Sequence, residues 1–94
     1  MKLKISNRFK KDASRIFKKK PELREKLADT LLLLKADIFN PALKTHKLKG
    51  ELKGLYSSSW GYDLRVIFKL SEVDNEKVIE LITAGTHDEV YWLH

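Results

Sequence analysis

Leu64-Arg65-Val66-Ile67-Phe68-Lys69 and Val78-Ile79-Glu80-Leu81-Ile82-Thr83 are two segments rich in β-branched and aromatic side chains, which are typical of strands. The stretch between them, from Ser71 to Glu76, is polar and acidic and favours a turn. This pattern predicts a β-hairpin. Because successive side chains of a strand point to opposite faces, Leu64, Val66 and Phe68 are expected on one face and Arg65, Ile67 and Lys69 on the other. A cation is therefore expected in mid-strand, on a face that is otherwise apolar.

A polar segment follows the second strand. Gly85-Thr86-His87-Asp88-Glu89-Val90-Tyr91 places an imidazole, two carboxylates and a phenol just after a glycine that permits a turn. If the two strands pair, Arg65 and His87 are expected near one end of the same sheet face.

Length and composition predict a single domain over residues 1–94. The chain has 94 residues, 43% of them hydrophobic, which is enough for one core. It has no cysteine, and its first residues, Met1-Lys2-Leu3-Lys4-Ile5-Ser6, do not form an apolar leader. The longest apolar run, Leu31 to Leu34, is far too short to span a bilayer. We therefore expect a cytoplasmic protein without a membrane partner.

The charge is unevenly distributed along the chain. Residues 1–50 hold 15 Lys plus Arg against 5 acidic residues, whereas residues 51–94 hold 4 against 8. A concentrated positive surface attracts nucleic acid through counterion release. The alternative is that the basic helices only present a solvated face.

Two helices are expected before the hairpin. Leu3 and Ile5 alternate with lysines, as in a short strand, and Ser6-Asn7 then offers a helix N-cap. The next apolar residues recur at helical spacing among basic ones. Lys20-Pro21 ends this helix and opens a second one. Its leucine stripe runs to about Phe39 and is too short for a coiled coil, so it is interpreted as core.

The remaining segments complete an α+β prediction. Leu43 to Gly54, with two glycines among lysines, suits a loop, and Leu55 to Trp60 is a plausible strand before a turn at Gly61-Tyr62. The order is a short N-terminal strand, an antiparallel helical pair, then a mainly antiparallel sheet. The helices are expected to cover one sheet face and to leave open the other, toward which Arg65 points.

Several kinds of chemistry lack their motifs. His46 and His87 are 41 residues apart and His94 is terminal, so no metal-ligand spacing exists. The four glycines match neither a P-loop nor a dinucleotide fingerprint. Ser57, Ser58 and Ser59 lack the context of a nucleophile. No metal and no cofactor is expected.

The remaining residue types suit metal-free cleavage of RNA. Cleavage that uses the 2′-hydroxyl needs a base for its proton, an acid for the leaving oxygen and a cation for the charge on phosphorus. His, Arg, Lys and Tyr can fill these roles. Taken singly, each also has a structural reading: His46 as an exposed loop residue, Arg65 as a surface cation and Tyr91 as an ordinary aromatic residue.

Four segments together resemble the RelE superfamily of bacterial toxins, and most of all its YafQ-like and RelE-like members. They are THKLKG at 45–50, LKGLYS at 52–57, DLRVIFKL at 63–70 and GTHDEVYW at 85–92. The resemblance covers essentially the whole chain. It implies a microbial RNase-like fold and a ribosome-dependent mRNA interferase that is held inactive by an antitoxin.

The resemblance also implies roles for individual residues. Arg65 matches the strand arginine that stabilises the scissile phosphate, His87 a histidine used as acid or base, and His46 a second histidine. Asp63 matches an acidic residue just before the strand, and Tyr91 an aromatic residue that stacks on a base or takes part in proton transfer. The basic residues expected to bind RNA backbone, from charge or from the resemblance, are Lys10, Lys11, Lys18, Lys19, Lys47, Lys49 and Lys53.

One departure from the family pattern leaves two alternatives open. YafQ-like toxins carry a further histidine about where Ser59 stands, and a serine is no base near neutral pH. The chain could therefore be a catalytically weakened toxin homologue. The other alternative is a ParE-like toxin, which binds DNA gyrase and needs no catalytic base.

Overall fold

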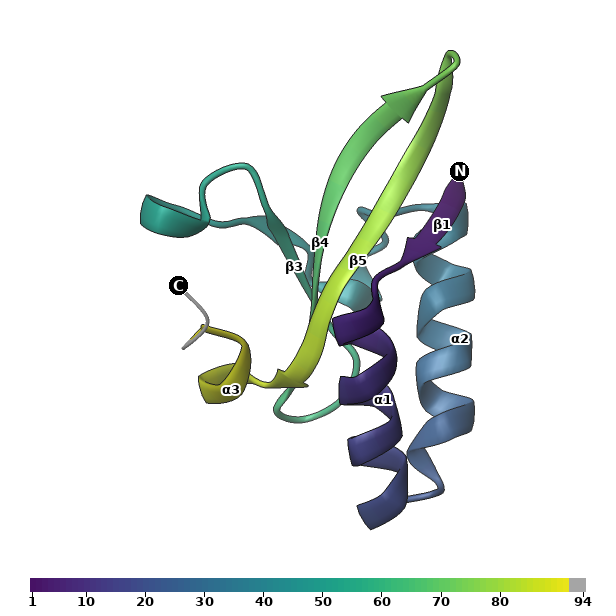
Figure 1. The fold of residues 1–94 in the computed structure, drawn as a ribbon, viewed down its shortest axis with the longest axis vertical. Coiled ribbons are helices and arrows are strands. Elements are labelled where there is room, and N and C mark those ends of the chain that lie inside the picture. Colours follow the sequence, from purple (N-terminus) through teal and green to yellow (C-terminus); the bar gives the residue numbers. More distant parts are fainter. Residues whose placement is uncertain (92–94) are drawn as a thin grey trace.

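The hairpin predicted from the sequence is the longest feature of the fold. It consists of β4 (Leu64–Val73) and β5 (Glu76–Thr86), joined by Asp74 and Asn75. Both turn residues have positive φ, 51° and 65°, as in the tight turns that match the twist of a hairpin. The strands are longer than predicted because residues 70–73, 76–77 and 84–86 continue the pairing. Figure 1 shows this end of the hairpin projecting beyond the rest of the sheet.

The computed structural model describes residues 1–91, and these residues confirm the α+β prediction. The sheet has five strands in the order β1-β5-β4-β3-β2. β1 (Lys2–Ile5) pairs with β5 in parallel, and the other pairs are antiparallel. The helices α1 (Asn7–Lys19) and α2 (Leu23–Ala36) follow β1 and lie on one side of the sheet (Figure 1).

The core lies between these two helices and one face of the sheet. Val66 and Phe68 of β4 and Ile79 of β5 are fully buried and share one cluster with Leu34 of α2 and Phe9 of α1. This is the face predicted from the alternation of β4. The pairing shifts by one residue between Ile67 and Phe68, which leaves Ile82 of β5 as an extra residue.

The N-terminal part of α1 covers the bare edge of β5. β1 pairs only with residues 78–81, so the backbone beyond Leu81 has no strand on that side. Ser6 supplies both the N-cap of α1 and a hydroxyl that donates to the carbonyl of Ile82. Asp12, nearly two turns further along, accepts from the Ala84 N–H. Backbone groups at this unpaired edge of the sheet thus find hydrogen-bond partners on side chains at the start of α1.

Several short elements differ from the sequence prediction. The segment predicted as a loop, Leu43 to Gly54, contains a 3₁₀ turn, Gly50–Leu52, and a two-residue strand, β2 (His46–Lys47). Another 3₁₀ turn, Pro41–Leu43, leads into it. β3 is Tyr56–Ser59, one residue shorter at each end than expected. α2 ends at Ala36 rather than near Phe39, because the Asp37 carboxylate accepts from the Phe39 N–H and turns the chain.

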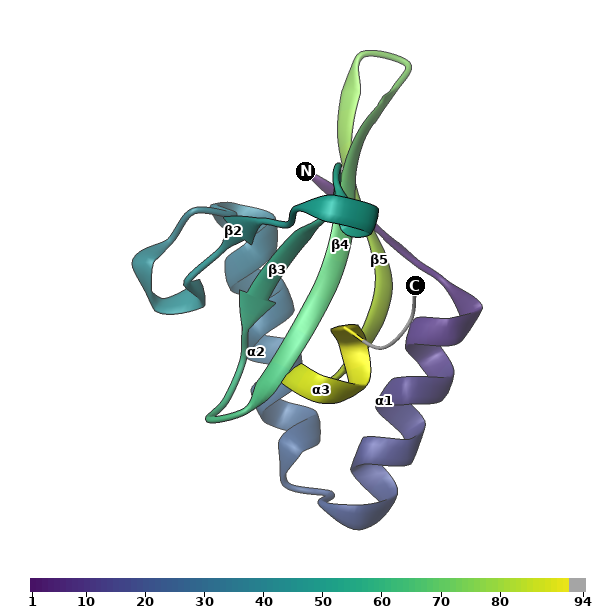
Figure 2. The ribbon, with the colours of Figure 1, turned by 90° about the vertical axis from the view of Figure 1, so that its left-hand side faces the viewer.

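A third helix, α3 (His87–Tyr91), was not predicted. It packs against β4 and β5 on the side of the sheet away from α1 and α2, as Figures 1 and 2 show. This side, which we call the open face, is therefore partly covered, and Ile67 on it is only 2% exposed. No helix within residues 1–91 is long and apolar enough to cross a membrane.

Candidate active site on the open face of the sheet

The register of the sheet brings His46 and Arg65 to the open face. His46 pairs with Ser57, and Arg65 pairs with Ser59, two residues further along β3. Paired residues share a face, and so do residues two apart, which places both side chains on the same side. They are separated by two strand spacings, or about 10 Å across the sheet. The sequence predicted the face of Arg65 but not the strand that carries His46.

Arg65 is half-buried and held by its neighbours. Its Nη1 donates to the carbonyl of Leu64 at 3.0 Å, and its own carbonyl accepts from Trp60 Nε1 at 3.2 Å. Its partner on β5 is Gly85, which has no side chain to occupy the space beside the guanidinium. The space over Gly85 is taken up by the Glu89 side chain, whose Oε1 would lie 3.0 Å from a Cβ at this position.

His46 is exposed at the start of β2, where its Nδ1 lies 3.3 Å from the carbonyl of Lys44. The Oγ of its partner Ser57 is buried and has no hydrogen-bond partner among the described residues. Such orphaned hydroxyls are uncommon in folded proteins.

His87 and Tyr91 lie on α3, one helical turn apart. Their rings meet edge to face with centroids 4.5 Å apart. The backbone N–H of His87 donates to the backbone carbonyl of Asp63 at 3.1 Å, which ties the start of α3 to the start of β4. His87 Nδ1 lies 3.3 Å from the Asp88 carboxylate. The contact with Asp88 is thus made by Nδ1 and not by Nε2.

A capping box explains why α3 begins at His87. Glu89 donates its backbone N–H to the Thr86 hydroxyl at 3.3 Å, and its carboxylate accepts from the Thr86 N–H at 2.9 Å. The hydrogen bond from the Thr86 N–H, aided by the charge of Arg15, holds the pKa of the Glu89 carboxyl below its ordinary value, although partial burial opposes this. The pattern Thr86-x-x-Glu89 is the sequence signal that predicts this helix, and it was overlooked.

Asp63 lies at the margin of this group of residues, and Ser59 lies opposite Arg65 on β3. Asp63 is exposed and lines a cavity of about 560 Å³ with Lys19, Thr86 and Glu89, toward α1 rather than toward His46. Ser59 is opposite Arg65 and half-buried, so a histidine there would be beside the guanidinium. The structure thus gathers His46, Arg65, His87 and Tyr91 on one side, with Asp63 at the margin.

The lysines predicted to bind RNA fall into two groups. Lys47, Lys49 and Lys53 are exposed around a cavity of about 470 Å³ beside β2. The others lie on α1, where Lys19 shares a stripe with Arg8, Asp12 and Arg15, and Lys11 and Lys18 are next to it. Lys10 lies on the opposite flank of the helix.

Arg15 and Asp12 are the residues near α3 that sequence analysis missed. Arg15 Nη2 is 3.5 Å from the Glu89 carboxylate, and Arg15 Nη1 is 3.2 Å from the Asp12 carboxylate. Asp12 is 5% exposed, although it is charged. The signal available in the sequence was an acid on the buried side of α1, one turn beyond Phe9 and one turn before Arg15.

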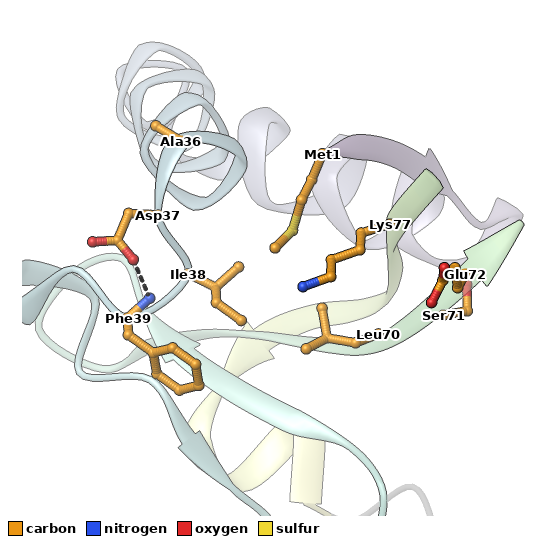
Figure 3. A pocket seen from close by; sticks show the side chains of 9 residues that line it. All are labelled: Met1, Ala36, Asp37, Ile38, Phe39, Leu70, Ser71, Glu72 and Lys77. Carbon is orange, nitrogen blue, oxygen red and sulfur yellow. Dashed lines mark hydrogen bonds between the residues drawn. The ribbon is translucent and has the colours of Figure 1, made fainter. Parts of the chain in front are cut away.

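A further cavity lies away from these residues. It has a volume of about 610 Å³ and lies between the end of α2 and the hairpin, lined by residues such as Met1, Ile38, Phe39 and Leu70 (Figure 3). None of the predicted catalytic residues contributes to it. Its lining combines apolar residues with Asp37, Glu72 and Lys77, and it is therefore a different place from the site predicted from the sequence.

No group of three or more potential ligands that could hold a metal ion exists within residues 1–91. Trp92, which ends one of the four resembling segments, and His94 lie outside the described residues.

Comparisons with known proteins agree with this architecture. The model of the family described as "Bacterial toxin of type II toxin-antitoxin system, YafQ" matches residues 1–91. A search of curated proteins gave no significant sequence match.

Solved structures are also similar over nearly the whole chain. A YoeB/ParE toxin from Agrobacterium tumefaciens is 24% identical with a TM-score of 0.77, and the match covers 93% of this chain and 99% of that one. YafQ from E. coli strain BL21(DE3) is 23% identical with a TM-score of 0.77, covering 95% and 96%. In the E. coli DinJ-YafQ complex the matched chain is 25% identical with a TM-score of 0.70, covering 95% and 96%. With the family match over residues 1–91, the chain belongs to the YafQ family of bacterial toxins of type II toxin–antitoxin systems.

Proposed function

We propose that this toxin is a metal-independent endoribonuclease that cleaves mRNA on the ribosome, in the cytoplasm, and thereby inhibits translation. The observation that carries the proposal is the grouping of two histidines, an arginine and a tyrosine on the open face, contributed by three different elements of the fold, β2, β4 and α3. A surface that only binds a partner has no need of that combination.

The proposed reaction is attack of the RNA 2′-hydroxyl on the neighbouring phosphate. The 2′-oxygen forms a bond to phosphorus as its proton passes to a base, and the bond from phosphorus to the 5′-oxygen breaks as that oxygen takes a proton from an acid. The products are a 2′,3′-cyclic phosphate and a 5′-hydroxyl. His87 and His46 are the candidate acid and base, and Arg65 stabilises the negative charge that builds on the phosphate oxygens. Tyr91 packs against His87 and is placed to stack on a base or to relay a proton.

The lysines around β2 and on α1 would hold the RNA backbone. Phosphate contacts of this kind set the register of the RNA without selecting its sequence. Since solved complexes of YafQ with DinJ exist, we also propose that this chain is neutralised by a cognate antitoxin protein.

Cleavage of mRNA on programmed ribosomes tests the proposal. Purified toxin should cut the mRNA, and Arg65→Ala and His87→Ala should each lower the single-turnover rate at least 100-fold. Lys69→Ala is the matched control, since it removes a cation from the same strand and the same face four residues away, and it should cleave at close to the wild-type rate.

A gyrase supercoiling assay with the same samples addresses the ParE-like alternative. Inhibition of gyrase without cleavage of ribosome-bound mRNA would refute the nuclease proposal. Slow cleavage that Ser59→His accelerates would instead identify a weakened nuclease.

A further inference from the structure

α3 carries two of the proposed catalytic side chains but cannot be stable by itself. It has five residues, far fewer than an isolated helix needs in water. The orientation of His87 and Tyr91 over the sheet must therefore be imposed from outside the helix.

The capping box connects the first turn of α3 only to Thr86, the residue just before the helix. Both of its hydrogen bonds join Thr86 and Glu89, so they define where the helix starts. They do not connect α3 to the layer formed by α1 and the edge of β5.

Arg15 supplies that connection. One guanidinium nitrogen faces Glu89 on α3 at 3.5 Å and the other faces Asp12 at 3.2 Å. The planar guanidinium can hold two carboxylates at separate nitrogens, which a single ammonium group cannot do in the same geometry.

Asp12 anchors this arrangement to the sheet. Its Oδ1 faces Arg15, while its Oδ2 accepts from the Thr83 hydroxyl at 2.5 Å and from the Ala84 N–H at 3.2 Å. The carboxylate is almost completely buried, so both contacts are protected from water and are costly to lose. A continuous chain of contacts thus runs from β5 through Asp12, Arg15 and Glu89 to the helix of His87.

Gly85 leaves the space that Glu89 uses. A Cβ at this position would be 3.0 Å from Glu89 Oε1 and 3.2 Å from Glu89 Cβ. The Glu89 side chain therefore folds back over the end of β5, which brings its carboxylate to both Thr86 and Arg15.

We propose that Arg15 and Glu89 are positioning residues, and that the contacts Asp12–Arg15–Glu89, here called the Arg15 bridge, hold α3 in the orientation that His87 and Tyr91 need for cleavage. This inference rests on the proposed nuclease function. It assigns Arg15 a role other than phosphate binding, although Arg15 belongs to the basic stripe of α1.

Two mild variants separate the positioning role from electrostatic attraction of RNA. Arg15→Lys keeps the charge but not the two-sided contact, so cleavage should slow about 10-fold if the bridge positions α3. The cleavage rate should be unaffected if Arg15 only attracts phosphate.

Glu89→Gln removes a negative charge beside the site, which would lower the KM if charge alone mattered. The bridge instead predicts a kcat reduced about 10-fold, with KM unchanged or lower. Lys18→Met, a loss of charge at an exposed position on the same helix, should change KM and leave kcat intact.

A structural readout makes the test independent of the nuclease proposal. In the toxin alone, the edge-to-face contact of His87 and Tyr91 shifts their ring proton resonances in NMR spectra. Arg15→Lys and Glu89→Gln should reduce these shifts and speed amide exchange in α3, while the amides of β4 keep their protection. If both variants retain the wild-type ring shifts, the bridge does not position α3. If wild-type toxin cleaves no RNA but the ring shifts respond as expected, the proposed function fails and the bridge stands.

Discussion

At the scale of single residues, Asp12 shows how one buried carboxylate can serve several elements. It lies on the polar margin of the apolar stripe of α1, yet the β5 edge and Arg15 both depend on it. Burying a charge is costly unless hydrogen bonds compensate, and here they do.

Replacing Asp12 should therefore destabilise the fold strongly. In Asp12→Ala, the Thr83 hydroxyl and the Ala84 N–H lose their acceptor inside the protein, at a cost of about 2–4 kcal/mol. Urea denaturation measures the change. Asp29→Ala is the control, because Asp29 is exposed on α2 and its loss should cost no more than about 0.5 kcal/mol. Equal stability of the two variants would contradict the anchoring role of Asp12.

Glu89 makes the order of α3 depend on pH. The pKa of its carboxyl is lower in the folded protein than its ordinary value of 4.5, chiefly because it accepts from the Thr86 N–H, with Arg15 also lowering it. A lowered folded pKa means that the ionised form stabilises the helix above about pH 4.5, and that this stabilisation is lost as the pH falls through the folded value.

NMR of α3 as a function of pH checks this dependence. The His87–Tyr91 contact should loosen below pH 4.5 in the wild-type toxin, before the sheet unfolds. In Glu89→Gln the transition should disappear, because the amide does not titrate. A transition that survives in Glu89→Gln would assign the effect to another carboxyl group.

At the scale of elements, the junction of β5 and α3 depends on a glycine. Gly85 is opposite Arg65 and beneath the folded-back side chain of Glu89. The missing side chain leaves room for the Glu89 side chain, and hence for the capping box.

Gly85→Ala should therefore displace α3 without disrupting the sheet. The added methyl group would meet Glu89 Cβ, which is close to the backbone and moves only if the helix moves. We expect a loss of about 1–3 kcal/mol from overpacking and a clear fall in the cleavage rate. Gly61→Ala is the comparison, because its Cβ would be closest to the flexible end of Leu64, and it should perturb both quantities less. If Gly85→Ala cleaves at the wild-type rate, the position of α3 is not critical.

At the scale of the whole molecule, the positive charge is concentrated on α1, which has six Lys plus Arg against one acidic residue, and on the segment around β2, while the hairpin turn is acidic. This division predicts that RNA approaches across β2 and α1.

The salt dependence of ribosome binding tests this orientation. Lys49→Ala and Lys18→Ala should each flatten the slope of log affinity against log salt by about one unit, with little effect on cleavage in the bound complex. Lys77→Ala is the internal control, because Lys77 is exposed on β5 beside the acidic hairpin turn, and it should keep the wild-type slope. If all three variants keep it, the basic surface is only a solvated face.

The sequence by itself determined the kinds of element, their order and the face of β4 that carries Arg65. These features follow from local patterns, since apolar periodicity, caps and prolines act between residues a few positions apart. Even α3 could have been predicted locally, from its capping box.

The tertiary structure alone decided that β1 pairs with β5, that β2 places His46 on the face of Arg65, and that α3 folds onto that face. It also decided that Asp12 is buried against Thr83, 71 residues away. Such contacts depend on the register between strands and on the packing of distant side chains, which no local pattern encodes.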